Sequence, residues 1–373
     1  MWTKIVPVTA LLTAVTFTVV PDATAHATPN TPVGGEALGS HGLVRPAGVD
    51  APPKTKATSY VIADLDTGDV LAAKDPHGRY LPASTQKMLT AVTLLPKLDK
   101  NRKVRPSANA CNQEGTAVGL TPKMTYKVDD LFRALMMSSG NDAAMALAET
   151  NGGVAKTMRD MNAEAHRLQA YDTVAKTPSG LDQPGQSSSA YDLALIARAG
   201  LANPDFRRYV STKTAKFPAP KNYYEISNHN KLLWRYQGTI GVKNGWTSKA
   251  QGSFVGAATR GGHTVLVAIM RHEGYFWEEV AKLLDWGFAV RGKAQPVGRL
   301  VDPLPDTPPQ AQRAPQAAAP TGQATPAARP SLLDASASRQ NGSTYTIGAI
   351  VIGGGLLFGL VWLGYGIRRR RRL

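Results

Sequence analysis

Pro82-Ala83-Ser84-Thr85-Gln86-Lys87 is the stretch that decides the fold and chemistry of this 373-residue chain. Ser84 is the only serine with a lysine three residues later. Apolar residues recur after Lys87, so the sequence predicts a helix that opens at Pro82 and ends before Pro96. Residues three apart share one face of a helix, which lets the hydroxyl and the amine meet. Because a neutral lysine can deprotonate a serine, the pair predicts a covalent nucleophile.

Two further motifs follow in order, Ser139-Gly140-Asn141 and Lys243-Asn244-Gly245. Ser-x-x-Lys, Ser-x-Asn and Lys-x-Gly in this order are typical of serine acyl-transfer sites. Taken singly, they also suit a helix cap, a break between helices and a turn at a strand end. Ser107-Ala108-Asn109 is a second Ser-x-Asn that lacks the other context. The ordered set therefore predicts one site, although no single motif does.

Each motif has a distinct predicted role. Ser84 is the nucleophile and Lys87 is its base. Burial and a second positive charge, which we expect from Lys243, lower the pKa of such a base. Ser139 relays a proton to the leaving amine, and Asn141 positions the substrate amide.

The third motif forms the other wall of the site. We expect Lys243-Asn244-Gly245 to lie on a strand along which the substrate binds. A developing oxyanion needs N–H donors, and the first is the backbone N–H of Ser84 at the positive end of its helix. The second donor is expected from the backbone of Trp246, on the same strand as the third motif.

The N-terminus carries a predicted secretory signal. Lys4 is followed by an apolar run over residues 5–20 and then by Ala23-Thr24-Ala25. A basic residue, a short apolar run and small residues are the three parts of a signal peptide, here residues 1–27. An uncleaved N-terminal anchor is the alternative, but the short run and its small residues favour cleavage.

The C-terminus carries a predicted membrane anchor. Residues 345–367 have no charged side chain and are long enough to cross a bilayer as one helix. Five arginines at 368–372 follow at once, which places the tail, residues 368–373, in the cytoplasm. We therefore expect a single-pass cell-membrane protein whose catalytic domain lies outside the cytoplasm.

Composition divides the chain between these signals. Residues 28–56 are rich in Pro, Gly and Ala and predict a flexible lead-in, while residues 57–301 have the mixed patterning of one catalytic domain. Residues 302–344 are rich in Pro, Ala and Gln and predict a linker, because they have too little apolar surface to fold. A chain that ends after about Leu300 is therefore expected to be folded, soluble and active.

Charge and cysteine content restrict the function classes. The net charge is +16, and 38 basic against 27 acidic residues remain when the five tail arginines are left out. A basic exported surface favours anionic wall polymers and lipid headgroups. No nucleic-acid recognition motif is present, so we expect no nucleic-acid partner. Cys111 is the only cysteine, which excludes an internal disulfide.

Hydrophobic patterning predicts one α/β domain between residues 57 and 301. Strands at both ends of the domain and helices between them indicate a sheet built from the two ends and covered by helices on one or both faces. The expected strands are 60–63, 70–73, 242–243, 254–259 and 264–270, and the expected helices are 82–95, 129–137, 142–149, 154–168, one from about 190, and 277–288.

Residues 58–290 resemble the low-molecular-mass penicillin-binding proteins, the serine D-alanyl-D-alanine carboxypeptidases of cell-wall synthesis. The resemblance rests on the three motifs, on LMMSSGNDAAMALAE at 135–149, on TPSGLD at 177–182 and on LLDWGF at 283–288. It implies the transpeptidase-like α/β fold shared with serine β-lactamases, an antiparallel sheet covered by helices. It also implies that Ser84 attacks the penultimate D-alanine carbonyl of peptidoglycan stem peptides, with β-lactams as inhibitors and no cofactor.

Two features depart from the family pattern. Asn244 stands where the family usually has Thr or Ser, whose hydroxyl helps to hold the substrate carboxylate. The amide of Asn244 or the hydroxyl of Thr247 is a possible replacement. The β-rich C-terminal domain common in the family is also not expected, because residues 302–341 do not have the composition to form it.

Two other functions compete with carboxypeptidase activity. A class A β-lactamase shares the three motifs, but it needs an acidic loop residue for deacylation, and no Glu-x-x-Leu-Asn follows Ser139. A catalytically weakened peptidoglycan-binding regulator is the non-enzyme alternative, suggested by Asn244. Metal catalysis is not expected, because five histidines lack ligand spacing. These are His77, His166, His229, His263 and His272.

Overall fold

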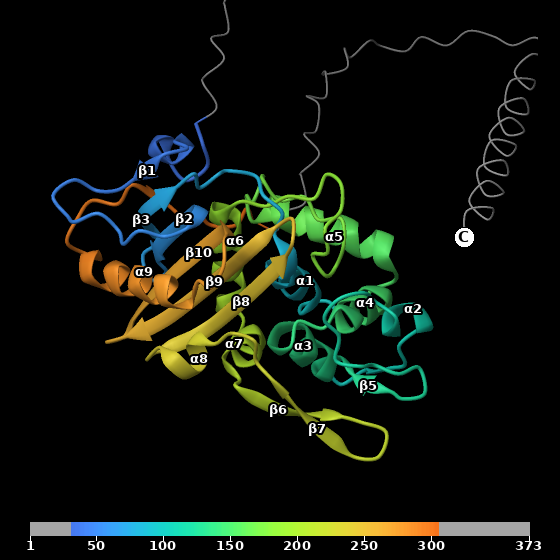
Figure 1. Cartoon of the computed structure of the whole chain (residues 1–373). Coiled ribbons are helices and arrows are strands. Elements are labelled where there is room, and N and C mark those ends of the chain that lie inside the picture. Colours follow the sequence, from blue (N-terminus) through green and yellow to red (C-terminus); the bar gives the residue numbers. More distant parts are fainter. Residues whose placement is uncertain (1–30, 306–373) are drawn as a thin grey trace, which may run out of the picture. The chain divides into compact units, whose positions relative to one another are not determined.

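The computed structural model describes residues 31–305, which form a sheet with helices on both faces (Figure 1). The main sheet has seven antiparallel strands, with β11 beside β3 and the others in the order β1-β3-β2-β10-β9-β8. Its strands are β1 (Leu43–Val44), β2 (Ala57–Asp64), β3 (Asp69–Lys74), β8 (Thr239–Thr247), β9 (Gln251–Arg260), β10 (His263–His272) and β11 (Gly298–Arg299). The predicted sheet built from the two ends of the domain is confirmed.

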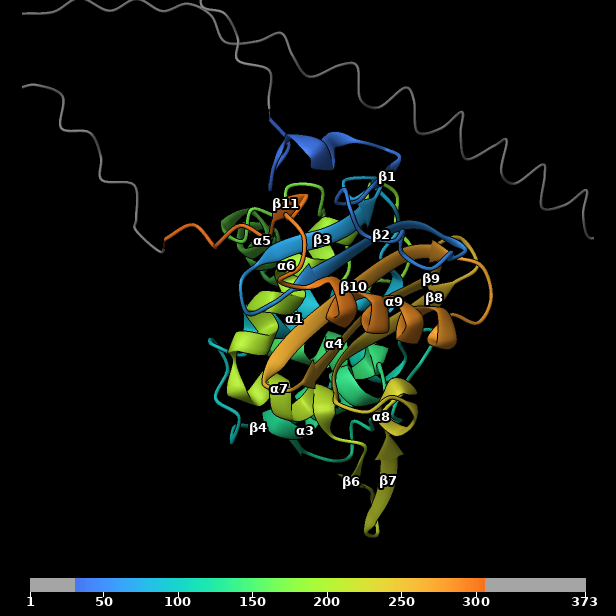
Figure 2. The same ribbon diagram turned by 90° about the vertical axis from the view of Figure 1, so that its left-hand side faces the viewer.

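The central strands are buried on both faces, as their near-continuous apolar sequence requires. The β9–β10 hairpin closes through Gly261-Gly262, and both glycines have a positive φ. A two-residue turn needs this conformation to match the right-handed twist of the strands that it joins. On one face lies α9 (Trp277–Val290), and on the other lies α6 (Ala190–Ala202), which is buried along most of its length (Figure 2). The two faces therefore have separate hydrophobic cores.

Apart from the short helix at residues 232–235, whose Leu232 belongs to the core beside α9, the remaining helices lie on the α6 side and carry the first two motifs (Figure 1). Five of them pack together, and the strand pairs β4–β5 and β6–β7 lie at their margin. The helices are α1 (Lys87–Leu94), α3 (Val128–Met137), α4 (Asn141–Thr150), α5 (Val154–Arg167) and α7 (Pro204–Ser211). The smaller elements are η1 (Glu36–Gly39), η2 (Ala83–Gln86), α2 (Ala108–Cys111), α8 (Leu232–Arg235), β4 (Lys103–Val104), β5 (Tyr126–Lys127), β6 (Thr214–Pro218) and β7 (Tyr223–Ser227).

The structure corrects the flexible lead-in expected at residues 28–56. Within its described part, β1 pairs with β3, and Leu38 is fully buried. Further along, the indole N–H of Trp286 donates to the carbonyl of Asp50 at 3.0 Å. Isolated anchors of this kind leave no periodic pattern in the sequence, which is why composition alone indicated a loose segment.

The C-terminal boundary lies slightly beyond the one expected at residue 301. The backbone N–H of Leu304 donates to the carbonyl of Arg167 at 2.7 Å, and the side chain of Gln169 donates to the carbonyl of Asp302 at 2.9 Å. Among the described residues, no helix is long and apolar enough to cross a membrane. The signal peptide at 1–27, the span at 345–367 and the tail at 368–373 lie outside the described residues.

The hydrogen bonds of Asp302 and Leu304 to the rest of the domain predict how truncation affects its stability. A chain that ends after Leu300 should have a free energy of unfolding about 1–3 kcal/mol lower than one that ends after Pro305, because it loses these two hydrogen bonds. Urea denaturation of the two proteins measures the difference. Equal midpoints and slopes would show that residues 301–305 do not contribute to the folded domain.

Candidate active site

The nucleophile lies on a short turn of 3-10 helix and its base lies on the helix that follows. The predicted helix from Pro82 is divided into η2, which carries Ser84, and α1, which begins at Lys87. Thr85 Oγ1 and Ser253 Oγ both donate to the carbonyl of Pro82 at 2.6 Å, so β9 holds the turn in place. Lys87 Nζ lies 2.9 Å from Ser84 Oγ. The predicted pair is therefore in hydrogen-bond contact.

Lys87 is fully buried and its amine is surrounded by three oxygens. Besides Ser84 Oγ, Nζ lies 2.7 Å from Asn141 Oδ1 and 2.6 Å from the carbonyl of Ser179. A neutral amine has two N–H donors and one lone pair. The two carbonyl-type oxygens only accept, so they take the two N–H groups. The lone pair is then left for the proton of Ser84, which is the arrangement of a general base.

Burial and charge favour the neutral form of this amine. Burial, followed by the nearby charge of Lys243, lowers the pKa of Lys87 well below its usual value, although Asp142 acts in the opposite direction. Lys243 is also buried, and burial lowers its pKa to about 7. Its Nζ donates to the carbonyl of Asn244 at 2.7 Å. The charge of Lys243 thus acts on the pKa of Lys87 in the expected direction.

The third motif approaches the nucleophile backbone so closely that only glycine fits. A Cβ built on Gly245 would lie 2.5 Å from the backbone N of Ser84 and 2.9 Å from that of Thr85. A second glycine, Gly180, lies at a positive φ, and its Cβ would meet the carbonyl O of Ala83 at 1.9 Å. Two glycines therefore hold the turn around Ser84 from opposite sides.

The loop at 177–182 is part of the site in a way that the motif analysis missed. Ser179 supplies the carbonyl that binds Lys87, and Thr90 Oγ1 fixes the loop by donating to the carbonyl of Pro178 at 2.7 Å. Gln86 Nε2 donates to the carbonyl of Thr177 at 2.6 Å. The available signal was the Pro-Ser-Gly sequence, which indicates a tight turn. A backbone carbonyl carries no residue-type signature that would have revealed its role.

The second motif is a sharp connection between α3 and α4. Ser139 is at φ 60, which helps to turn the chain between the two helices, and it is buried. Within residues 31–305 its hydroxyl makes no hydrogen bond, so its role as proton relay stays a prediction. Asn141 reaches Lys87, and its Nδ2 donates to the carbonyl of Glu114 at 2.6 Å. Asp142 fixes the facing loop by accepting backbone N–H groups from residues 118–120.

The pleat of β8 divides the predicted substrate-binding residues between two faces. β8 is the last strand in the order of the main sheet, so one backbone edge has no neighbouring strand. Lys243 and Gly245 face the nucleophile, and alternation places Asn244 and Trp246 on the opposite face. Thr247 Oγ1 donates to the carboxylate of Asp182, at 2.8 Å from its nearer oxygen. This hydroxyl is therefore already engaged, which weakens its candidacy as a replacement for the family hydroxyl.

Two further groups of titratable residues lie outside the three motifs. Burial, Lys243 and Lys87 lower the pKa of His229 to about 4, which places this histidine in the electrostatic neighbourhood of both lysines.

Separately, His77, Asp172 and Asp192 approach within 4.8 Å of one another. The two ring nitrogens of His77 lie 2.8 Å from Asp172 Oδ2 and 3.0 Å from the carbonyl of Val33. A ring that donates from both nitrogens has no lone pair for a metal.

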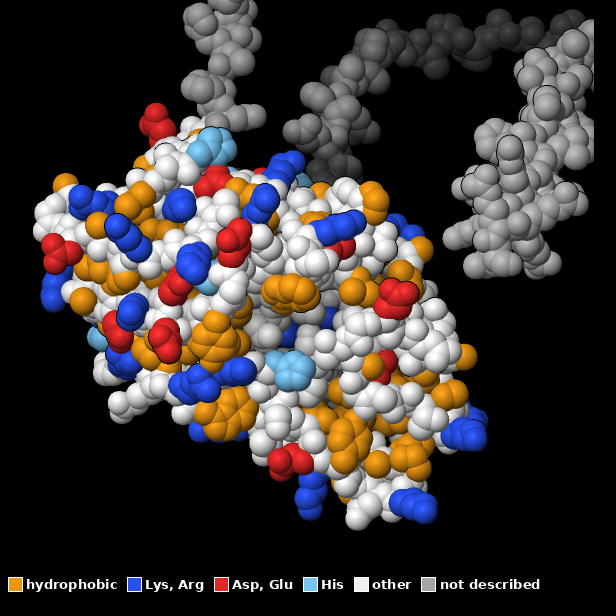
Figure 3. Space-filling view, viewed as in Figure 1, with side chains coloured by type: hydrophobic (Ala, Val, Ile, Leu, Met, Phe, Trp, Pro, Cys, Tyr) orange, Lys and Arg blue, Asp and Glu red, His pale blue; other side chains and the backbone are white. Residues whose placement is uncertain are grey.

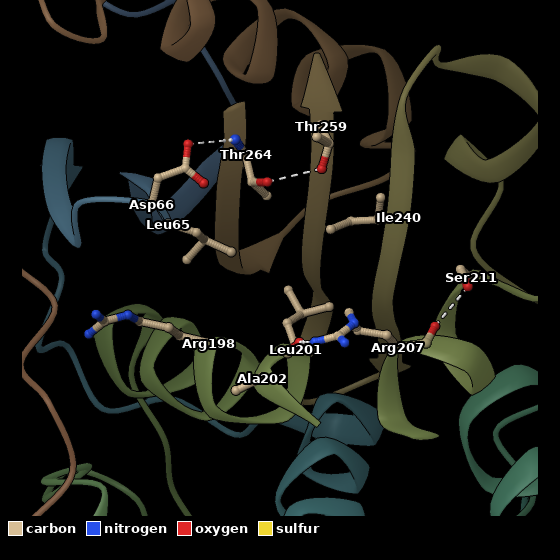
Figure 4. Close-up of a pocket in the computed structure, with 10 residues that line it drawn as sticks. All are labelled: Leu65, Asp66, Arg198, Leu201, Ala202, Arg207, Ser211, Ile240, Thr259 and Thr264. Atoms are coloured by element: carbon tan, nitrogen blue, oxygen red, sulfur yellow. Dashed lines mark hydrogen bonds between the residues drawn. The ribbon is translucent and has the colours of Figure 1, made fainter. Parts of the chain in front are cut away.

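A cavity away from the motifs lacks this chemistry. Its volume is about 530 Å³, and it lies between α6, α7 and the sheet (Figure 4). Figure 4 shows aliphatic side chains around its interior, and Ser211 donates to the carbonyl of Arg207 rather than meeting a base. The lining residues are Leu65, Asp66, Arg198, Leu201, Ala202, Arg207, Ser211, Ile240, Thr259 and Thr264. The site is therefore defined by Ser84 and not by this cavity.

Comparison with known proteins identifies the family. Residues 47–274 match the D-alanyl-D-alanine carboxypeptidase family, peptidase family S11. The chain belongs to this family. The D-alanyl-D-alanine carboxypeptidase DacB2 of Mycobacterium tuberculosis is 43% identical over 264 residues, which cover 69% of this chain and 90% of that protein. DacF of Bacillus subtilis, also named a D-alanyl-D-alanine carboxypeptidase, is 30% identical, and the match covers 63% of this chain and 62% of that protein.

Solved structures of the family share the fold. A D-alanyl-D-alanine carboxypeptidase from M. tuberculosis superposes with a TM-score of 0.67 at 41% identity, covering 69% of this chain and 99% of that one. The Streptomyces K15 DD-transpeptidase superposes with a TM-score of 0.62 at 28% identity, covering 64% of this chain and all of that one. The predicted family and its α/β fold, an antiparallel sheet with helices, are both confirmed.

The close approach of β8 predicts a sensitive substitution. Gly245→Ala should lower the rate at which a labelled penicillin acylates the protein by ~10²-fold, because a shift of about 1 Å in reacting groups costs that much. Gly42→Ala is the control, since its Cβ would meet only Ser40 Oγ at 3.5 Å. Acylation by Gly245→Ala at the wild-type rate would contradict the packing described here.

Proposed function

We propose that this protein is a serine D-alanyl-D-alanine carboxypeptidase that removes the terminal D-alanine from peptidoglycan pentapeptides. The observation that carries the proposal is the environment of Lys87. Its buried amine lies 2.7 Å from Asn141 Oδ1, 2.6 Å from the carbonyl of Ser179 and 2.9 Å from Ser84 Oγ. In its neutral form the amine gives its two N–H groups to the first two oxygens, which leaves its lone pair for the proton of Ser84. Family membership supports the same activity, and the names of the relatives support the substrate.

Acylation begins with the transfer of the Ser84 proton to Lys87. The freed Oγ attacks the carbonyl of the penultimate D-alanine and gives a tetrahedral oxyanion. We assign the oxyanion donors to the backbone N–H groups of Ser84 and Trp246. The unpaired edge of β8 suits an extended peptide, which would add as a further strand and bring its carbonyl opposite Gly245.

Collapse of the oxyanion breaks the peptide bond. The proton held by Lys87 passes to the leaving nitrogen, with Ser139 as the relay, and D-alanine departs while Ser84 carries the acyl group as an ester. Water then attacks this ester and gives a proton to Lys87. Lys87 passes this proton to Ser84 Oγ as the bond between Oγ and the acyl carbon breaks, which releases the shortened peptide as a carboxylic acid and restores the free hydroxyl. A β-lactam acylates Ser84 by the same first step, because its amide is attacked by the same oxygen.

Asn244 is the departure that bears on substrate affinity. The pleat places its side chain on the face opposite Ser84, beside the edge along which the peptide would lie. An amide N–H there is able to donate to the substrate carboxylate, as the hydroxyl does in relatives. Because Lys87, Asn141 and Gly245 are all in position, the catalytic centre favours an active enzyme over a silent regulator.

The nucleophile assignment has a direct test. Ser84→Ala should abolish both D-alanine release from a D-alanyl-D-alanine peptide and covalent labelling by a penicillin, because among residues 31–305 no other serine hydroxyl is hydrogen-bonded to a lysine amine. Ser211→Ala, an exposed serine remote from Lys87, is the control and should keep both. Residual labelling of Ser84→Ala at the wild-type rate would move the nucleophile elsewhere.

We also propose that the enzyme acts outside the cytoplasm while anchored in the cell membrane. The support is the signal-like sequence at 1–27, the uncharged run at 345–367 and the arginines that follow it. The stretch at 302–344 then serves as a tether between the domain and the bilayer.

Fractionation of cells tests the anchor. The full chain should sediment with membranes and require detergent for release, whereas a chain that ends after Pro305 should appear in the medium. Both should release D-alanine from small peptides at similar rates. Recovery of the full chain from the medium, or of the truncated chain with membranes, would remove the anchor proposal without affecting the chemistry.

A further inference from the structure

Three exposed aromatic side chains lie on the face of the sheet opposite Ser84. Trp246 is 68% exposed, Tyr275 is 51% exposed and Trp234 is 48% exposed. We call this set the aromatic shelf. Large aromatic rings in a folded chain are usually covered, and exposed groups of them mark interaction sites. In the space-filling view, hydrophobic and basic side chains gather beside the central hollow (Figure 3).

Trp246 lies on β8, the strand along which we propose that the substrate binds. It pairs across β8–β9 with Gly252, and Gly252 pairs across β9–β10 with His272. A Cβ on Gly252 would meet the ring of Phe276 at 3.1 Å, so this ring lies over the same face, next to the position of Trp246. Phe276 is the direct neighbour of Tyr275 in the chain. Phe276, which is buried, therefore connects the level of Trp246 on the sheet to Tyr275.

Trp234 is part of α8, and the same helix contacts Tyr275. Arg235 Nη1 donates to the hydroxyl of Tyr275 at 2.6 Å, and Lys231 Nζ lies 5.4 Å from the centre of its ring. α8 itself is anchored by Leu232, which is buried and packs near Gly256 of β9. Neither Lys231 nor Arg235 pairs with a carboxylate of the described residues. The shelf thus combines three exposed aromatic rings, of which Tyr275 is held by these two contacts, with two positive charges that are available to a partner.

The length of the shelf follows from strand register. Gly256, under α8, pairs with Val242, and Gly252 pairs with Trp246. Four residues of strand separate these levels, or about 13 Å, which suits about two or three linked pyranose rings. Asn244 lies between the two levels and shares the face with Trp246. A ring-stacking surface with one amide along it is well suited to N-acylated sugars.

We propose that the aromatic shelf binds the glycan strand to which the peptide substrate is attached, through stacking of N-acylated amino-sugar rings on Trp234, Tyr275 and Trp246. This rests on the proposed function, which brings such a polymer to β8. A peptide bound along the edge of β8 leads its attached sugars past Trp246. The charges of Lys231 and Arg235 complement the carboxylates of neighbouring stem peptides. Trp and Tyr have few rotatable bonds, so they lose little conformational entropy when a ligand stacks on them.

Direct binding tests the shelf independently of catalysis. The full chain carrying Ser84→Ala, in detergent, is titrated with a hexamer of β-1,4-linked N-acetylglucosamine, which has no peptide. Adding Trp234→Ala or Tyr275→Ala should weaken binding by about fivefold or more, the scale of one aromatic contact. Tyr171→Ala is the matched control, because Tyr171 is similarly exposed but contacts His166 on another part of the domain. It should leave the affinity unchanged.

Kinetics on the active chain give a second readout. Trp234→Ala and Tyr275→Ala should raise KM about fivefold for a pentapeptide carried on an oligosaccharide and leave kcat unchanged. Their KM and kcat for the free pentapeptide should stay within about twofold of wild type. A structural defect would lower both activities together, so the difference between the two substrates identifies a binding surface.

Several results would overturn the proposal. One is that the protein does not bind the hexamer. Another is that Tyr171→Ala loses as much affinity for the hexamer as the two shelf variants do. A third is loss of binding to anionic phospholipid vesicles, rather than to the hexamer, in the two shelf variants, which would make the shelf a membrane contact. Failure of the free pentapeptide to react, together with shelf-dependent hexamer binding, would refute the carboxypeptidase proposal and leave the shelf standing.

Discussion

The amine of Lys87 is the point on which the rest of the structure depends. Its contacts with Asn141 Oδ1, the carbonyl of Ser179 and Ser84 Oγ join three segments that are far apart in the sequence. A buried amine is tolerated only when it is neutral or fully paired. Burial of the Lys87 amine lowers the stability of the folded domain. The same burial lowers the pKa of the amine, so that it is neutral and can act as a base.

The sheet and the helices meet these demands with close backbone packing. Gly245 lets β8 approach the backbone of Ser84, and Gly180 lets the loop at 177–182 approach from the other side. β8 thus performs two tasks on two faces. Its Lys243 and Gly245 complete the catalytic centre, while Trp246 belongs to the opposite surface, where the shelf begins. A single strand at the edge of the sheet therefore connects acylation chemistry with recognition of the larger polymer.

The sequence pattern predicted the catalytic residues more completely than it predicted the contacts that hold them in place. Ser84, Lys87 and Asn141 were found because hydroxyl, amine and amide are residue-type signals at recognisable spacing. Ser179 was missed because its contribution is a backbone carbonyl. The segment at 28–56 was expected to be flexible because the anchors in its described part, such as Leu38, are isolated and not periodic. Thr247 was considered for substrate binding, but its tie to Asp182 depends on a long-range approach that spacing does not reveal.

The pKa of Lys87 tests the central claim most directly. It is measured by NMR from the pH dependence of the Nζ signal in protein labelled at lysine, with Lys87→Arg to assign the signal. We expect Lys87 to lose its proton well below the usual lysine range, and acylation to fall as the pH drops through that pKa. Lys243→Met should raise the pKa of Lys87 by removing a nearby positive charge. A Lys87 signal that stays protonated up to about pH 10, as in free lysine, would contradict its role as the base.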